Sequence, residues 1–170
     1  YSFNYVVHFA AETHVDKSIH EPELFVIENV EKTVKLLQVV KEWPGCHFHH
    51  ISTDEVFGSI KSGAFLETDP YEPNSPYSAS KAASDHMVRA FGKTYGLSYT
   101  ISHACNNVGP FQYPEKLVPL MLKRMLAGEP LPVYGNGQQI REWLDIADHA
   151  QGVDLILEKP ILVIKYIMTV

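Results

Sequence analysis

The feature that most constrains the fold is the alternation of short apolar segments with longer segments of helical periodicity. Residues 5–10, 47–52 and 98–104 are apolar or β-branched runs of the length typical of buried strands. Between them, residues 22–42 and 77–95 place apolar side chains at helical spacing. Strands joined through helices pair in parallel, so this order predicts an α/β fold with a doubly wound parallel sheet.

The remaining segments divide into loops, two shorter helices and one hairpin. Gly96 and Gly128 are suitable residues for ending helices, because glycine readily adopts the left-handed conformation found there. An Asn-Gly pair at 136–137, flanked by apolar residues, predicts a hairpin. The predicted boundaries are loops at 11–16 and 59–76, helices at 117–127 and 147–157, and a hairpin within 131–144.

Polar side chains follow each of the three predicted strands at the point where the strand ends. Thr13 follows the first strand, residues 53–55 (Thr-Asp-Glu) follow the second, and residues 106–107 (Asn-Asn) follow the third. In open α/β sheets, ligands bind outside the carboxyl ends of the strands. These side chains are therefore expected to line one cleft.

Tyr77 and Lys81 are four residues apart at the start of a predicted helix, so they share one helix face. A phenol ionises near pH 10 unless a neighbouring positive charge favours the phenolate. With the Lys81 ammonium close by, Tyr77 is expected to act as a base toward an alcohol. An isolated match of this kind also fits a packed tyrosine beside an exposed lysine.

Composition excludes several classes of function. The net charge of −6 provides no basic surface for nucleic acid, and no apolar run has the length of a membrane span. Cys46 and Cys105 have no metal or redox spacing, which is typical of a reduced, cytoplasmic protein. His47 and His49 share a strand face with His50 opposite, and no third ligand is suitably spaced, so no metal site is predicted.

Six motifs, occurring in one order, together resemble a known family. They are residues 9–19 (FAAETHVDKSI), 52–58 (STDEVFG), 75–81 (SPYSASK), 105–107 (CNN), 114–119 (PEKLVP) and 141–144 (REWL). The chain is thereby similar to the dTDP-glucose 4,6-dehydratases, which belong to the extended short-chain dehydrogenase/reductase family. The resemblance covers most of the chain, to about Lys159, and implies a Rossmann-like sheet with part of a smaller substrate-binding domain.

The resemblance implies a chemical role for each residue of the central motifs. Bound NAD takes a hydride from carbon 4 of the glucose while Tyr77 accepts the hydroxyl proton, and Thr53 orients that hydroxyl. Glu55 removes the proton from carbon 5, and Asp54 protonates the departing hydroxyl on carbon 6, to which the hydride returns. The two carboxyl groups must then differ in pKa.

This mechanism makes a geometric demand on the second strand. Adjacent residues of a regular strand point to opposite faces. Asp54 and Glu55 can therefore serve one substrate only if the strand has already ended before them.

The resemblance also assigns binding residues, one position at a time. Asn29 corresponds to the family's Asn-x-x-Gly-Thr motif, although Lys32 replaces the glycine. The implied cofactor contacts are Phe9, Ala10, Ala11, Thr13, Asn29, Tyr77, Lys81 and Asn107. The implied substrate contacts are Thr13, Thr53, Asn106, Lys116, Leu117, Pro132, Val133, Tyr134 and Arg141.

The chain departs from the family pattern in several places. It has no glycine-rich turn for the NAD pyrophosphate, which predicts a fragment that lacks the first βαβ units and binds NAD weakly. Val108 and Asp145 replace family tyrosines, and the tail after Pro160 reads as unrelated sequence. Residues 1–109 are expected to form a partial NAD-binding domain, and 110–170 a partial nucleotide-sugar-binding region.

Three functional readings stay open at this point. The first is NAD-dependent dehydration of dTDP-glucose to dTDP-4-keto-6-deoxyglucose. The second keeps this chemistry with UDP-glucose as the substrate. The third is a non-catalytic fragment that binds nucleotide sugars. The family further implies a homodimer formed through helices 22–42 and 77–95.

Overall fold

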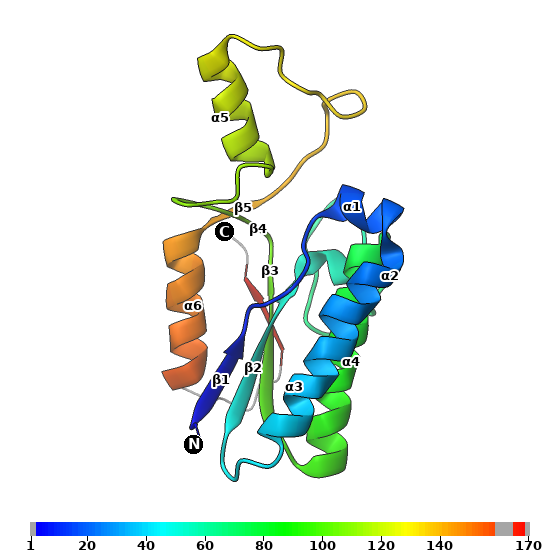
Figure 1. Ribbon diagram of the computed structural model, residues 1–170, viewed down its shortest axis with the longest axis vertical. Helices are drawn as coiled ribbons and strands as arrows, with labels where there is room; N and C mark the ends of the chain where they lie inside the picture. Colours follow the sequence, from blue (N-terminus) through cyan, green and yellow to red (C-terminus); the bar gives the residue numbers. More distant parts are fainter. Residues whose placement is uncertain (1–2, 159–164, 169–170) are drawn as a thin grey trace.

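A four-stranded parallel sheet forms the centre of the computed structural model, which describes residues 3–158 and 165–168. Figure 1 shows the strands side by side, with their carboxyl ends directed toward one end of the molecule. The sheet has the order β1-β2-β3-β6. Its strands are β1 (Tyr5–His8), β2 (His47–Thr53), β3 (Ser98–Ala104) and β6 (Lys165–Met168).

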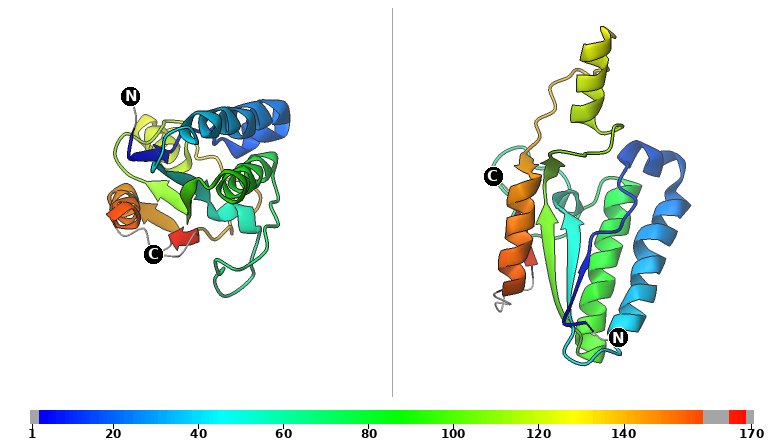
Figure 2. Two further views of the ribbon diagram at one scale, coloured as in Figure 1. Left: turned by 90° about the horizontal axis from the view of Figure 1, so that it is seen from below. Right: turned by 60° about the vertical axis from the view of Figure 1, so that its left-hand side comes forward.

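Helices cover both faces of the sheet, as the views in Figure 2 show. The first helices and α4 lie on one face, and α6 (Ile146–Glu158) lies on the other. The helices of the first face are α1 (Val15–His20), α2 (Pro22–Phe25), the π-helical segment η1 (Val26–Glu31), α3 (Lys32–Val40) and α4 (Pro76–Tyr95). This arrangement confirms the predicted α/β class with a parallel sheet.

The face toward α3 and α4 changes from apolar to polar along the strands. At its lower end, buried residues from α3, α4, β2 and β3 form the main core: Leu37, Val40, Cys46, Phe48, Val88, Phe91, Leu97 and Ile101. Nearer the carboxyl ends of the strands, the same face carries His50, Ser52 and His103. The carboxyl ends of the strands therefore carry buried polar side chains, and the packed apolar core beneath them holds these side chains in place.

The predicted histidine alternation on β2 is also present. His49 contacts Thr100 and Ser102 on one face, whereas His50 contacts Asp85 of α4 on the other. Within residues 3–158 and 165–168, no cluster of three or more His, Cys, Asp or Glu side chains could hold a metal ion.

Beyond the sheet, the chain forms a smaller unit at the carboxyl ends of the strands (Figure 1). It contains α5 (Leu117–Ala127) and a two-stranded parallel sheet of β4 (Asn106–Val108) and β5 (Trp143–Asp145). No residue of α5 is buried. None of the helices in the described ranges is long and apolar enough to cross a membrane.

Two local predictions were wrong. The predicted loop at 11–16 ends in α1, which begins at Val15 because the His14 side chain accepts a hydrogen bond from the Lys17 amide. The predicted hairpin is absent: Gly137 closes a turn on Tyr134, but β5 pairs with β4 instead. One cause is the proline at 132, which lacks the N–H that a strand ladder needs.

The tail was also misread from sequence. Residues 165–168 form β6, which pairs in parallel with β3 from Ile101↔Lys165 to Ala104↔Met168. Their apolar side chains therefore belong to the sheet. The remaining tail residues, 159–164 and 169–170, lie outside the described residues.

Candidate active site

The second strand ends where the proposed chemistry requires it to end. β2 stops at Thr53, and Asp54–Phe57 form a 3₁₀ turn, η2. The Thr53 side chain caps this turn by accepting a hydrogen bond from the Glu55 amide at 3.3 Å and donates to Asp54 Oδ1 at 3.3 Å. Because the turn breaks the strand alternation, Asp54 and Glu55 are no longer held on opposite faces.

Tyr77 lies in the first turn of α4, close to the end of β2. Ser75 and Ser78 form a reciprocal capping box and Pro76 occupies the first turn, which together fix where the helix begins. Tyr77 is only 8% exposed, and its ring packs edge-on against Phe25.

The surroundings of Tyr77 raise the pKa of its phenol. Burial is the largest cause, and the nearby carboxylates of Glu55 and Asp54 add to it, while a hydrogen bond with Thr53 acts in the opposite direction. Tyr77 and the Thr53–Glu55 segment therefore share one small region of the structure.

Lys81 lies one helical turn further along α4, but its charge is not directed at Tyr77. Its Nζ donates to the backbone oxygen of Ile51 at 2.8 Å, and the residue is 4% exposed. Burial lowers the pKa of Lys81 to about 8. The expectation that Lys81 lowers the pKa of Tyr77 is not met in this conformation, because the carbonyl of β2 holds the ammonium.

The carboxyl groups of Asp54 and Glu55 both have raised pKa values, chiefly because each is largely buried. Their charged neighbours differ. Arg141 and Lys116 lower the pKa of Glu55, whereas Glu142 raises that of Asp54. The predicted separation into one low and one high pKa is therefore not seen, because both values are raised. Asp54 and Glu55 differ only in the charges around them.

The loop after β1 is fixed from below by Asn29, which lies in the π-helical segment η1. Its side-chain oxygen accepts from the Glu12 amide at 2.8 Å, and its Nδ2 donates to the Glu12 oxygen at 3.0 Å and to Ser80 Oγ at 2.9 Å. Asn29 is 1% exposed. The structure thus places it beneath the loop as a support, joining the loop to α4.

The predicted cofactor residues 9–11 and Thr13 line this loop. Phe9 is 55% exposed at the end of β1, with its ring centroid 6.0 Å from that of His149. Lys116 reaches back to the loop and donates to both the backbone oxygen and Oγ1 of Thr13, at 2.9 and 3.0 Å. The loop and the start of α5 therefore meet.

Asn106 and Asn107 lie on β4, directly beyond β3. The side chain of Asn107 donates to the Cys105 oxygen at 3.4 Å, while its Oδ1 is buried and has no hydrogen-bond partner within the described chain. A buried amide oxygen without a partner costs free energy, so this atom is suited to receive a donor from a ligand.

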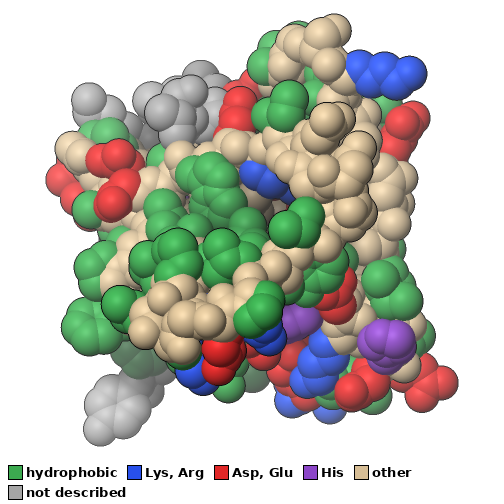
Figure 3. Space-filling model, turned by 90° about the horizontal axis from the view of Figure 1, so that it is seen from above, with side chains coloured by type: hydrophobic (Ala, Val, Ile, Leu, Met, Phe, Trp, Pro, Cys, Tyr) green, Lys and Arg blue, Asp and Glu red, His purple; other side chains and the backbone are tan. Residues whose placement is uncertain are grey.

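The remaining predicted substrate residues are less closely gathered. Leu117 is 43% exposed, and Val133 and Tyr134 are 68% and 61% exposed on the loop that contains Pro132. The structure brings Lys116 and Arg141 close enough to influence Glu55 but leaves residues 132–134 outside this group. Figure 3 views this end of the molecule and shows hydrophobic side chains around a few Lys and Arg side chains.

Sequence reasoning missed a buried polar cluster below the site. Asp85, on α4, accepts hydrogen bonds from Ser52 at 2.9 Å and His103 at 3.0 Å. The available signal was the position of Asp85, four residues after Lys81 and hence on the same helix face.

Comparison with known proteins places the chain in a family. The family model described as GDP-mannose 4,6 dehydratase matches residues 1–167. A curated dTDP-glucose 4,6-dehydratase of Xanthomonas campestris pv. campestris is 51% identical over 164 residues, which are 91% of this chain and 47% of that protein. A Haemophilus influenzae protein of the same name is 50% identical over 165 residues, covering 91% of this chain and 49% of its own length.

A solved structure shows the same relationship in three dimensions. The dTDP-glucose 4,6-dehydratase of Streptomyces venezuelae, crystallised with NAD bound, superposes with a TM-score of 0.92 at 48% identity and covers 95% of this chain and 50% of its own. The chain spans about half the length of the relatives it matches. The family match extends beyond Lys159, and this chain belongs to the family described as GDP-mannose 4,6 dehydratase.

Proposed function

We propose that this chain carries the catalytic residues of an NAD-dependent dTDP-glucose 4,6-dehydratase, a lyase that forms dTDP-4-keto-6-deoxyglucose. One observation carries the proposal: the end of β2 brings a threonine hydroxyl and two carboxyl groups within electrostatic reach of the Tyr77 phenol. The named relatives, each about half covered by this chain, support the same substrate.

The chain's own groups divide the proton transfers between them. Tyr77 accepts the proton of the hydroxyl on carbon 4, and Thr53 holds that hydroxyl through a hydrogen bond. NAD, when bound, supplies the hydride acceptor for carbon 4 and the hydride donor for carbon 6. Because burial raises the pKa of Tyr77 in the free chain, the phenol needs an added positive charge or a changed Lys81 contact to act as a base at neutral pH.

The neighbouring charges assign the two carboxyl groups. Burial and Asp54 raise the pKa of Glu55, but the cations Arg141 and Lys116 act in the opposite direction and favour its ionised form, so it serves as the base at carbon 5. Partial burial raises the pKa of Asp54 and the negative charge of Glu142 adds to this effect, which favours the protonated form, so Asp54 serves as the acid at carbon 6.

The residues present fit the reactive end of NAD. Asn107 offers a buried amide oxygen without a partner, and residues 9–13 offer a loop at the carboxyl end of β1. We assign Phe9, Ala10, Ala11, Thr13, Tyr77, Lys81 and Asn107 to this end of the cofactor, with Asn29 supporting the loop through Glu12.

The 170-residue chain is expected to bind NAD only weakly. It has no glycine-rich turn at a helix N-terminus to hold the pyrophosphate. Isothermal titration with NAD should give a dissociation constant at least about 100-fold weaker than that of the Xanthomonas relative, the loss of about 3 kcal/mol. An affinity equal to that of the relative would contradict this expectation.

We further propose that residues 110–170 contribute part of the nucleotide-sugar site, beside a partial NAD-binding region of residues 1–109. We assign Thr13, Asn106, Lys116, Leu117 and Arg141 to this site. Lys116 contacts Thr13, and Arg141 suits a diphosphate because guanidinium can donate two parallel hydrogen bonds. The loop of residues 132–134, in which Val133 and Tyr134 are exposed, would close over the sugar nucleotide.

A chimera provides the test of this function. The matched segment of the Xanthomonas dehydratase is replaced by residues 1–158 of this chain, and product is followed by the absorbance of the 4-keto sugar with dTDP-glucose or UDP-glucose. Turnover of dTDP-glucose alone is the expected result. Turnover of UDP-glucose instead would show that UDP-glucose is the substrate. Binding of the sugar nucleotide without product would support a non-catalytic fragment.

We also propose a cytoplasmic homodimer. The outer surface of the first helical layer exposes Val26, Ile27 and Val39 at 56%, 45% and 51%, and α4 ends in Tyr95 at 56%. Both cysteines are buried and free, which suits a reducing compartment.

A further inference from the structure

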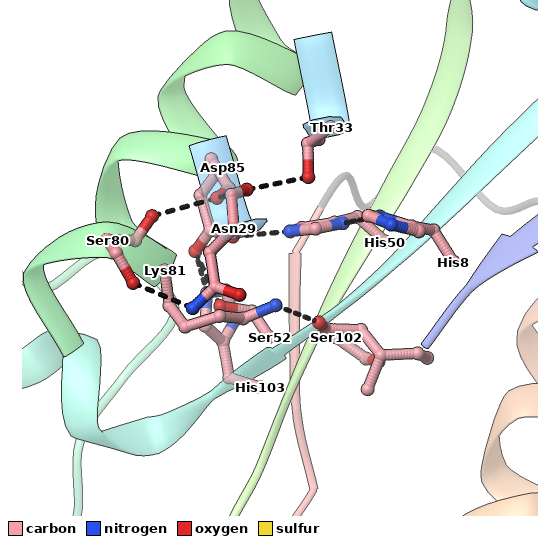
Figure 4. A network of polar contacts seen from close by, with 12 residues as sticks. His8, Asn29, Thr33, His50, Ser52, Ser80, Lys81, Asp85, Ser102 and His103 are labelled. Carbon is pink, nitrogen blue, oxygen red and sulfur yellow. Dashed lines mark hydrogen bonds and ion pairs between the residues drawn. The ribbon is translucent and has the colours of Figure 1, made fainter. Parts of the chain in front are cut away.

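We propose that Asp85 is a positioning residue of the active site, which fastens α4 to β2 and provides the buried counter-charge of Lys81. Figure 4 shows Asp85 and Lys81 on the same side of α4, both directed at the strands. The proposal is about the interaction between the charges of Asp85 and Lys81. Only the effect of this interaction on catalysis rests on the proposed function.

Two consecutive residues of β2 are tied to this helix face. Lys81 Nζ donates to the backbone oxygen of Ile51 at 2.8 Å, and Ser52 Oγ donates to Asp85 Oδ2 at 2.9 Å. The helix that carries Tyr77 is thereby held in register with the strand that delivers Thr53. A shift of α4 along β2 would break both contacts together.

The carboxylate of Asp85 is deeply buried and only half satisfied by hydrogen bonds. Asp85 is 2% exposed. Its Oδ2 accepts from Ser52 and from His103 Nε2, at 2.9 and 3.0 Å. Its Oδ1 lies 3.4 Å from His50 Nε2, but neither atom makes a hydrogen bond within the described residues. A buried carboxylate with one oxygen left without a hydrogen bond is costly unless an opposite charge is close.

Lys81 is the cation that meets this requirement on α4. It is 4% exposed and one helical turn from Asp85. Among residues 3–158 and 165–168, its ammonium donates only to a neutral carbonyl and forms no contact ion pair. Asp85 opposes the effect of burial by raising the pKa of Lys81, so each group reduces the cost of burying the other.

The other ionisable groups around the pair come from every element packed against it. Burial lowers the pKa values of His8 and His50, so both are neutral at pH 7 and add no charge beside Lys81. These groups are His8 on β1, His50 on β2, His103 on β3, Tyr71 in the loop before α4, Tyr77 on α4 and Lys165 on β6.

The decisive experiment titrates Lys81 in the free chain by side-chain NMR, with its signal assigned from Lys81→Met. Asp85→Asn keeps the shape of the side chain but removes its charge, and Ser52→Ala removes the tie to β2 but keeps the charge. In Asp85→Asn the acid dissociation constant of Lys81 is expected to increase at least about tenfold, and in Ser52→Ala by less than about twofold.

If Asp85 had only a structural role, Asp85→Asn and Ser52→Ala would both lower the melting temperature, and the acid dissociation constant of Lys81 would be the same in both. That result would overturn the proposal. If Asp85→Asn does not fold, the double variant Lys81→Met/Asp85→Asn decides. Recovery of the folded state supports the charge pairing, and a double variant as unfolded as the single one refutes it. Because no substrate or cofactor is present, these outcomes are independent of the chimera assay.

Discussion

Glu55→Gln in the chimera is expected to lower the rate of product formation by about 10²–10⁴-fold, the usual contribution of a general base. The amide keeps the size of the side chain but cannot accept the proton from carbon 5. Binding of dTDP-glucose should change much less, since Arg141 and Lys116 remain in place. The readout is the formation of the 4-keto product in single-turnover experiments.

Deuterium uptake separates the two carboxyl groups. In deuterated water, Glu55→Gln should also lose exchange at carbon 5, whereas Asp54→Asn should keep exchange and lose elimination of the hydroxyl from carbon 6. Glu67→Gln is the matched control, because Glu67 is an exposed residue of the loop before α4. Full activity in Glu55→Gln would remove Glu55 from the mechanism.

The second large effect is acid unfolding between about pH 6.5 and 4. Burial lowers the pKa of several histidines in the folded chain, while the unfolded chain keeps values near 6.5. The pKa of His8 and of His49 falls to about 4, and burial also lowers that of His50 well below its usual value. The same direction holds for His47 and His149.

The direction of this effect follows from proton linkage. Between pH 4 and 6.5 the unfolded chain binds more protons than the folded chain, so the free energy of unfolding decreases as the pH falls. For His49, which is fully buried, a pKa lowered from 6.5 to about 4 corresponds to about 3 kcal/mol by pH 4. Several such residues approach the whole stability of a domain, about 5–15 kcal/mol.

Urea unfolding at pH 7.5, 6.0 and 5.0 measures this decrease. His149→Leu should flatten the pH dependence, because both ring nitrogens of His149 are buried without hydrogen-bond partners among residues 3–158 and 165–168. His20→Gln is the control, since His20 is exposed and should leave the pH dependence unchanged. Equal stability at pH 7.5 and 5.0 would show that the buried histidines do not govern acid unfolding.

Periodicity and helix-ending residues predicted most of the fold. The strand at 98–104 and the helix at 117–127 form with the predicted boundaries, and Gly96 and Gly128 adopt left-handed conformations after their helices. These features are local, because side-chain alternation and backbone conformation act over a few residues. The pairing of β5 with β4 and of β6 with β3 depends on distant segments, so it could not be read from either segment alone.

At the site, the amino-acid sequence by itself determined which groups gather at the strand ends, because the carboxyl ends of parallel strands share one edge of the sheet. The adjacency of Asp54 and Glu55 also required β2 to end before Asp54 if both were to reach one substrate, and the 3₁₀ turn at 54–57 meets this requirement. Only the tertiary structure decided the partners and charges of these groups. Lys81 turns to Ile51, and Asp85 lies beneath it, since hydrogen bonding and burial depend on atoms that meet only after folding.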